Sequence, residues 1–225
     1  MPPRAHGPQS PRTAVNHPVF ARFYARVSVQ ADIRGGLAAV RAELLAGLSG
    51  RVIEIGAGNG LNFPHYPRAV SEVVAIEPEP TLRRLALRAA YRSDVPVDVV
   101  PATAEALPVK SEAFDAAVCS LVLCTVRDLP RSLAELHRVL RPGGEVRFFE
   151  HGLAPGPAMA AVQRGLDRTL WPRLFGGCHT SRDALAALEA AGFDITSQRG
   201  LRIPERGPAL PTSYCVLGSA RRPPA

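Results

Sequence analysis

The sequence is almost free of lysine and has no dense basic segment. Lys110 is the single lysine among 27 basic residues, and the formal net charge is +7. The arginines are dispersed, without the interleaved aromatic residues that mark a nucleic-acid-binding face. Their excess, together with abundant Ala, Pro and Gly, is typical of a genome with biased base composition. We therefore expect no nucleic-acid partner.

Long hydrophobic runs are also lacking. No apolar run reaches about 18 residues, so we expect no transmembrane helix. The N-terminal residues have charge but no apolar core, which argues against a secretory signal and favours a cytoplasmic protein. Apolar residues make up 46% of the chain, enough for a globular core. We expect residues 1–14 to be a Pro-rich disordered tail and residues 15–220 to form a single domain.

Metal-binding cysteine pairs are missing as well. The four cysteines are Cys119, Cys124, Cys178 and Cys215, and none belongs to a CxxC pair. A chain of this size does not need a disulfide framework, so reduced thiols are expected. Acidic residues do not cluster after the fourth predicted strand. The sequence therefore predicts no metal site.

The stretch Arg51–Gly60, RVIEIGAGNG, is the most informative part of the chain. Its apolar, β-branched start suits a buried parallel strand. Its three glycines suit a tight turn where the backbone approaches a ligand closely. The dinucleotide fingerprint G-x-G-x-x-G/A fits poorly, because Leu61 stands at its last position. A nicotinamide-linked oxidoreductase and a plain connecting turn stay open as alternatives.

An acidic residue followed by G-x-G-x-G resembles motif I of the class I S-adenosylmethionine (SAM) methyltransferases. SAM carries an α-ammonium group and a sulfonium, so an acidic residue beside the loop is favourable. The resemblance implies SAM as the cofactor, bound by Glu54, Gly56, Ala57, Gly58, Asn59 and Gly60.

The second predicted strand, 72–76, supports this interpretation. It ends at Glu77, 21 residues after Gly56, which is close to the spacing expected of an acid that binds a ribose. A carboxylate there can accept hydrogen bonds from both ribose hydroxyls. We expect Glu77 and the adjacent Pro78 to contact the cofactor.

The third predicted strand, 95–100, leads into the segment ATAEALP. This segment resembles the adenine-side loop of the ubiquinone/menaquinone-type methyltransferases. Thr103 stands where that family has an acid, so the resemblance implies adenine contacts from Thr103, Ala104 and Glu105.

Strand and helix patterns alternate through five strands, which predicts a parallel sheet with helices on both faces. The string LAELHRVLRPGGEVRFFEHG resembles the helix, R-P-G-G turn and fifth strand of class I methyltransferases. That resemblance implies an α/β fold with a doubly wound, seven-stranded Rossmann-like sheet of order 3-2-1-4-5-7-6, strand 7 antiparallel. Besides the fifth strand, we expect helices at 16–26, 31–48, 81–91, 129–140 and 181–191, and strands at 52–55, 72–76, 95–100, 114–119, 193–195 and 214–217.

Three later segments resemble the methyltransferase-like branch that methylates alkyl thiols. They are Val118–Val126, Glu150-His151 and Trp171–Arg182. The resemblance implies a small-molecule methyl acceptor and favours an alkyl thiol. Quinone-type carbon methylation and small-molecule oxygen methylation are alternatives. A further alternative is a protein that binds SAM without transferring its methyl group.

The ends of the fourth and fifth predicted strands carry the remaining candidates. Ligands bind at the carboxyl ends of parallel strands, so we expect Ser120 and Leu121 to line the cofactor site. His151 follows the fifth strand, and we expect it to be the catalytic residue, as a base or as an acceptor contact.

Two segments flank this site. The helix at 16–26 is expected to cap the cofactor pocket, and residues near 153–177 are expected to form a lid. An apolar stripe on the lid can cover the acceptor, touch a membrane surface peripherally, form a homodimer contact or pack on its own domain. The stripe consists of Met159, Val162, Leu166, Leu170 and Leu174.

Overall fold

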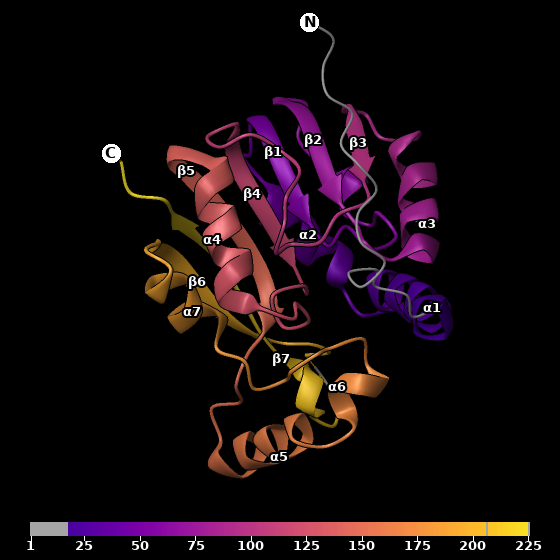
Figure 1. The fold of residues 1–225 in the computed structure, drawn as a ribbon. Coiled ribbons are helices and arrows are strands. Elements are labelled where there is room, and N and C mark those ends of the chain that lie inside the picture. Colours follow the sequence, from indigo (N-terminus) through magenta and orange to yellow (C-terminus); the bar gives the residue numbers. More distant parts are fainter. Residues whose placement is uncertain (1–17, 206, 225) are drawn as a thin grey trace, which may run out of the picture.

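The fold is built on one mixed sheet of seven strands in the order β3-β2-β1-β4-β5-β7-β6 (Figure 1). The structure is a computed structural model, and it describes residues 18–205 and 207–224. The first five strands run parallel, and β7 is antiparallel to both its neighbours. This confirms the predicted fold. The strands are β1 (Gly50–Ile55), β2 (Val70–Ile76), β3 (Val97–Val100), β4 (Phe114–Ser120), β5 (Leu140–His151), β6 (Asp194–Arg202) and β7 (Tyr214–Arg221).

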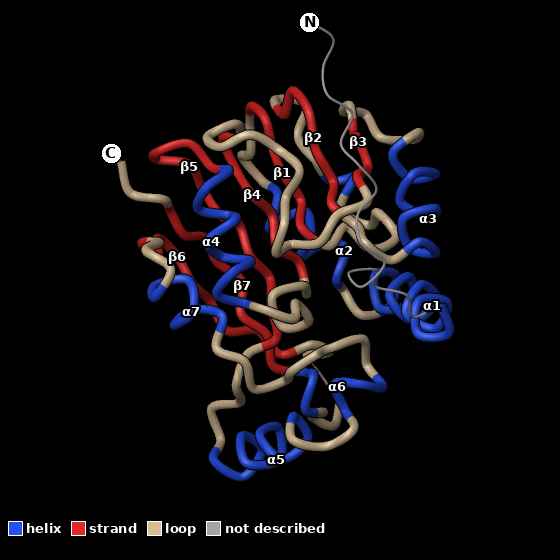
Figure 2. The backbone as a smooth tube through the Cα atoms, viewed as in Figure 1, coloured by secondary structure: helices blue, strands red, loops and turns tan. Residues whose placement is uncertain are grey.

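Helices cover both faces of the sheet (Figure 2). Leucines of α2 join one buried apolar cluster, and leucines of α4 and α7 join a second cluster on the other face. Strand β1 serves both, since Val52 belongs to one cluster and Ile53 to the other. The helices are α1 (Pro18–Arg34), α2 (Leu37–Leu45), α3 (Pro80–Ala90), α4 (Leu129–Val139), α5 (Pro157–Asp167), α6 (Trp171–Leu174) and α7 (Ala184–Ala190), with 3-10 turns η2 (Phe63–His65) and η3 (Pro211–Ser213).

The N-terminal helices begin and end at other residues than predicted. The tail at 1–14 and the start of the helix at 16–26 lie outside the described residues. From Pro18 on, α1 continues to Arg34, and α2 begins only at Leu37. Gly36 separates them, because its φ of 76° is left-handed and cannot continue a right-handed helix. The prediction of one helix over 31–48 was therefore wrong.

The C-terminal elements also differ from the prediction. Strands β6 and β7 are longer than the predicted 193–195 and 214–217. The added residues of β6 are mostly polar and exposed, because β6 is an edge strand, and this hid them from a hydrophobic pattern. Helix α7 starts at Ala184 because the side chain of Asp183 caps it, accepting from Ala186 N at 3.0 Å.

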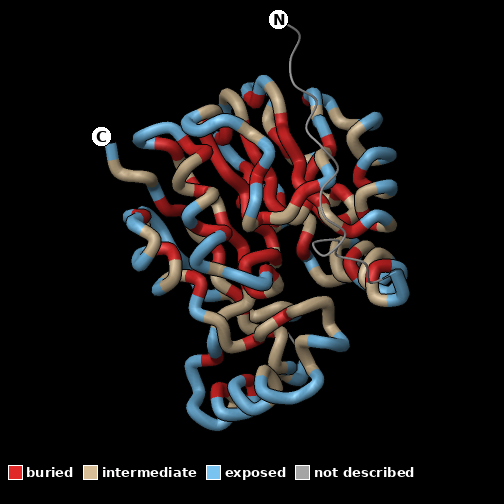
Figure 3. Tube along the Cα trace, in the orientation of Figure 1, coloured by how far each residue is buried: buried red, intermediate tan, exposed pale blue. Residues whose placement is uncertain are grey.

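Burial follows the strands, whereas the region of α5 and α6 is largely exposed or half-buried (Figure 3). The predicted lid at 153–177 forms these two helices instead of one continuous stripe. Its residues Val162, Leu170 and Leu174 are 49%, 60% and 66% exposed. Between residues 18 and 224, position 206 aside, no helix is long and apolar enough to span a bilayer.

The loops that follow β1 and β4 pack tightly against each other. Gly56 has a φ of 65°, and a Cβ added there would overlap the Val122 side chain. Gly143 has a similar φ of 78°, but a Cβ there would meet nothing within 4 Å. Both the backbone conformation and the packing therefore require glycine at position 56, whereas at position 143 only the conformation does.

Substitution of these two glycines by alanine separates the two constraints. Gly143→Ala is expected to lower the free energy of unfolding by about 1–2 kcal/mol, the cost of a left-handed residue with a Cβ. Gly56→Ala adds an overpacking cost of about 1–3 kcal/mol and is expected to be clearly less stable. Urea unfolding of both variants measures the difference. Equal losses would mean that the two loops do not pack as described.

Candidate active site

Glu77 joins the glycine loop to the end of β2. Its carboxylate accepts hydrogen bonds from Gly58 N at 2.7 Å and from Glu79 N at 2.8 Å. The residue is only 4% exposed, and burial raises the pKa of Glu77 to about 7 even though both hydrogen bonds lower it. Each oxygen accepts one backbone N–H and so keeps acceptor capacity for a ligand. The structure thus brings the predicted ribose-binding carboxylate to the predicted loop.

Glu54 lies beneath the same loop but is occupied differently. Asn62 Nδ2 donates to one of its oxygens at 2.8 Å, and the Tyr66 hydroxyl donates to the other at 2.7 Å. Burial raises the pKa of Glu54 to about 7, against the lowering effect of these two hydrogen bonds. In this structure Glu54 braces the segment that follows the glycines. A direct contact with the cofactor stays a prediction.

Arg41 on α2 is a central residue that sequence reasoning missed. It is 5% exposed and donates through Nε to Asp32 at 2.8 Å. Its Nη1 group donates to Asn62 Oδ1 at 2.7 Å and to Ser120 Oγ at 3.3 Å. The buried guanidinium therefore ties α1, the segment after the glycine loop and the end of β4 together. The available signal was an arginine on the apolar face of a predicted helix.

Helix α1 lies against the glycine loop. Asn59 Nδ2 donates to Ser28 Oγ at 3.2 Å, and a Cβ added at Gly58 would lie 3.5 Å from the Tyr24 ring. Gly58 has a φ of 58°, so its backbone adopts the left-handed conformation that suits glycine. The loop residues Ala57 and Gly60 are buried, and the role of α1 as a cap on the cofactor stays a prediction.

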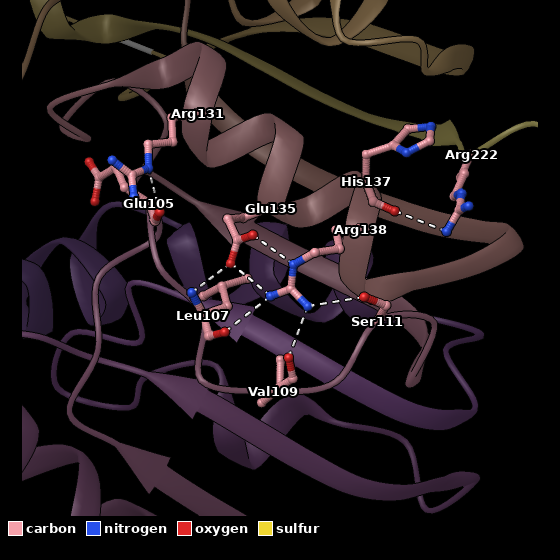
Figure 4. A network of polar contacts seen from close by, with 9 residues as sticks. All are labelled: Glu105, Leu107, Val109, Ser111, Arg131, Glu135, His137, Arg138 and Arg222. Carbon is pink, nitrogen blue, oxygen red and sulfur yellow. Dashed lines mark hydrogen bonds and ion pairs between the residues drawn. The ribbon is translucent and has the colours of Figure 1, made fainter. Parts of the chain in front are cut away.

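The loop after β3 is fastened to α4 (Figure 4). The carboxylate of Glu105 accepts from the backbone N–H groups of Arg127 at 3.0 Å and Asp128 at 3.3 Å, and Arg131 Nε donates to the Glu105 carbonyl at 2.9 Å. Glu105 thus holds the turn before α4, and its contact with adenine stays a prediction. Thr103 pairs with Ala106 in an isolated bridge. Ala104 is buried, and Pro78 is half-buried.

Arg138 fixes the rest of this loop. It forms an ion pair with Glu135 on the same helix and donates to the carbonyls of Leu107 at 3.1 Å and Val109 at 3.0 Å (Figure 4). Glu135 in turn accepts from Leu107 N at 2.8 Å. The ion pair lowers the pKa of Glu135. These contacts hold the predicted adenine-side loop against α4.

Glu150 holds the loop that follows β4. The fully buried carboxylate accepts from the backbone N–H groups of Val122 and Leu123, both at 2.9 Å, and of Cys124 at 3.3 Å. Burial raises the pKa of Glu150, although the three N–H groups lower it. Leu121 enters this loop with a φ of 56°, an unfavourable value for leucine and typical of functional sites.

A cluster of sulfur and imidazole lies at the ends of β4 and β5. Cys178 Sγ is 3.4 Å from His151 Nδ1, and Cys124 completes a group whose ligand atoms all lie within 4.8 Å of one another. The hydrogen bond with Cys124 lowers the pKa of the Cys178 thiol to about 5, assisted by His151. Burial lowers the pKa of His151, but its interactions with Cys178 raise it more, so it lies above its usual value.

A cavity of about 340 Å³ is lined by residues close to Cys178 in the sequence. Three of these residues are arginines. Arg182 is already engaged, since it donates to the carbonyls of Leu123 and Val126, both at 2.8 Å. Asp167 is engaged with Thr180 and Ser181. The cavity is lined by Arg164, Asp167, Arg168, His179, Ser181 and Arg182.

Comparison with known proteins agrees with this geometry. A methyltransferase-domain family model matches residues 53–148. The human thiol S-methyltransferase TMT1A is 34% identical over 71% of this chain and 67% of its own length. The ubiquinone/menaquinone biosynthesis C-methyltransferase UbiE of Syntrophotalea carbinolica is 32% identical over 71% of this chain and 70% of its own.

A similar fold occurs in the [4+2]-cyclase SpnF, with a TM-score of 0.63 and 20% identity. The match covers 84% of this chain and 80% of that one, and at this identity it speaks for the fold alone. The glycine loop, the sheet order and the relatives lead to one family. The chain belongs to the class I SAM-dependent methyltransferases, and SAM is its methyl donor.

Proposed function

We propose that this enzyme transfers the methyl group of SAM to the sulfur of a small-molecule thiol. One observation carries the proposal. The three segments that resemble alkyl-thiol methyltransferases are far apart in the sequence, yet each contributes one residue to a single cluster, namely Cys124, His151 and Cys178. Family membership rules out the nicotinamide-linked alternative.

Methyl transfer from SAM requires mainly that the enzyme align the acceptor with the methyl group. The sulfonium is already activated, so methyl transfer is an in-line displacement that depends on holding nucleophile and methyl group together. A thiol with a pKa near 8.5 is a few per cent thiolate at neutral pH, and the thiolate is strongly nucleophilic. His151 lies at the acceptor end of β5, and we assign it the role of acceptor contact or base.

The binding of SAM is expected to release a proton through Glu77. Burial raises the pKa of Glu77 to about 7 in the free protein, and ribose hydroxyls stabilise the ionised carboxylate, so binding lowers this pKa. As the pH increases towards 7, the affinity for SAM should rise by up to about tenfold per pH unit. Above pH 7 the affinity should level off. Calorimetry in buffers of different ionisation enthalpy measures the released proton.

Glu77→Gln and Glu54→Gln form a matched pair for this test, because both acids are buried with a pKa of about 7. Glu77→Gln should weaken SAM binding about 10- to 100-fold, the loss of charge-assisted hydrogen bonds, and abolish the proton release. Glu54→Gln should keep the release. If the release follows Glu54 instead, the ribose assignment of Glu77 is wrong.

The acceptor class is tested by incubation with SAM and an alkyl thiol, with the corresponding alcohol as a control of the same shape. We expect S-adenosylhomocysteine and a thioether heavier by one CH₂, detected by mass spectrometry. The rate should rise about tenfold per pH unit below the thiol pKa, since the thiolate is the nucleophile. Methylation of quinols or phenols with unreacted thiols would favour the carbon or oxygen alternatives. Bound SAM without any product would indicate a non-catalytic protein.

Exposed apolar side chains support a peripheral partner. On α1, Val19, Phe23 and Val27 follow each other at helical spacing and are 80%, 55% and 46% exposed. Phe20 of α1 lies close to Gly176, so this face of α1 lies near the exposed Leu174, the last residue of α6. We propose that it touches a membrane surface or a second copy of the chain.

Vesicle flotation and light scattering test this proposal. The protein is expected to float with vesicles or to have the mass of a dimer, and the double change Phe23→Ser, Leu174→Ser should abolish whichever is seen, because it removes the apolar contact area. Tyr91→Ser is the control, since Tyr91 is 94% exposed at the end of α3. A wild-type monomer that stays free of vesicles would contradict the proposal.

A further inference from the structure

The cluster of Cys124, His151 and Cys178 has the geometry of a metal site. In a tetrahedral zinc site with Zn–S near 2.3 Å and Zn–N near 2.1 Å, sulfur and nitrogen ligands lie about 3.6 Å apart and two sulfurs about 3.8 Å apart. The measured distance from Cys178 Sγ to His151 Nδ1 is 3.4 Å, and all three ligand atoms lie within 4.8 Å. Small side-chain movements therefore suffice to place a metal ion among them.

The three ligands are also held in place by backbone contacts. Cys124 N donates to Glu150, the residue before His151, at 3.3 Å. His179, the residue after Cys178, donates its backbone N–H to the Cys124 carbonyl at 2.9 Å. Two of the three ligand pairs, Cys124 with His151 and Cys124 with Cys178, are thus joined by short contacts between chain segments. Such support is what a metal site needs, since ligands must be oriented before the ion binds.

We propose that Cys124, His151 and Cys178 bind one zinc ion. Two thiolates and an imidazole favour a borderline-soft ion such as Zn²⁺ over the oxygen-loving Mg²⁺ and Ca²⁺. Among the described residues the cluster supplies three ligands, which is the number typical of zinc sites with an exchangeable fourth position. Sequence patterns did not predict this site, because its ligands come from three separate segments without a CxxC pair.

The fourth position gives the zinc a role in the proposed reaction, and this part rests on the proposed thiol acceptor. The thiol binds zinc as a thiolate and releases its proton to solvent. A sulfur electron pair then attacks the SAM methyl carbon, the bond from that carbon to the sulfonium breaks, and S-adenosylhomocysteine leaves. The thioether, a weak zinc ligand, dissociates. His151 acts here as a ligand through Nδ1 and replaces the base assigned above.

The test begins with metal content. The full-length protein, purified under reducing conditions, is expected to hold about one zinc per chain by elemental analysis. Replacement of zinc by Co²⁺ should produce visible d–d bands and a thiolate-to-cobalt charge-transfer band. Loss of any one ligand should weaken metal binding about a hundredfold or more, in the variants Cys124→Ser, Cys178→Ser and His151→Gln. This loss exceeds the one seen when a residue that only hydrogen-bonds to a metal ligand is changed.

Cys119→Ser and Cys215→Ser are the controls, because both residues are buried cysteines outside the cluster. They should keep the zinc content and the cobalt spectrum. SAM binding identifies any variant that fails to fold, and His151→Gln provides a test in which no cysteine is changed. An unloaded wild-type protein that binds SAM but no Co²⁺, or a Cys124–Cys178 disulfide under reducing conditions, would overturn the proposal.

The zinc proposal and the thiol proposal fail separately. If thiols are methylated at the same rate with and without zinc, the function stands and the role of the metal falls. If the Co²⁺ protein shows the expected spectrum but an added alkyl thiol does not alter its visible bands, the site is structural and the fourth position is not used. A change in those bands on addition of the thiol, but not of its alcohol analogue, is the expected result.

Discussion

The buried carboxylate of Glu150 is the interaction on which the loop after β4 depends. It accepts three consecutive backbone N–H groups of the loop after β4. Without it, each buried N–H would lose a partner at a cost of about 1–3 kcal/mol. The same loop packs Val122 against Gly56 and presents the Cys124 carbonyl to His179. One side chain of β5 therefore sets the position of the cofactor loop and of the segment before α7 together.

A second set of buried charges organises the donor end, and it shows how one residue type serves two tasks. Glu54 and Glu77 are both buried, and burial raises the pKa of each to about 7. Glu54 receives side-chain donors from Asn62 and Tyr66, one on each oxygen, and so joins β1 to the segment that follows the glycine loop. Glu77 receives backbone N–H groups of Gly58 and Glu79, again one on each oxygen, and so lies against the glycine loop itself. The partners, and not the burial, distinguish a brace from a binding group.

Features that depend on residues close together in the sequence could be predicted from the sequence. The glycine loop, the acid at the end of β2 and the sheet order follow from local patterns and a family resemblance, and the structure has them. The break at Gly36 was missed because the helical pattern of apolar residues continues on both sides of the glycine pair. Arg41 and the Cys124, His151 and Cys178 cluster were missed for another reason. Their partners are distant in the chain, and only the folded sheet brings them together.

The division of the sheet explains how a common fold can host different reactions. Most of the proposed donor contacts come from β1, β2 and β3 and the loops that follow them, and Ser120 and Leu121 add the end of β4. The proposed acceptor residues come from the ends of β4 and β5 and from the segment before α7. A cyclase shares the fold, so the fold itself does not determine the chemistry. Because Glu150 couples the two halves, the acceptor segments can change side chains while the loop that carries them keeps its place against Gly56.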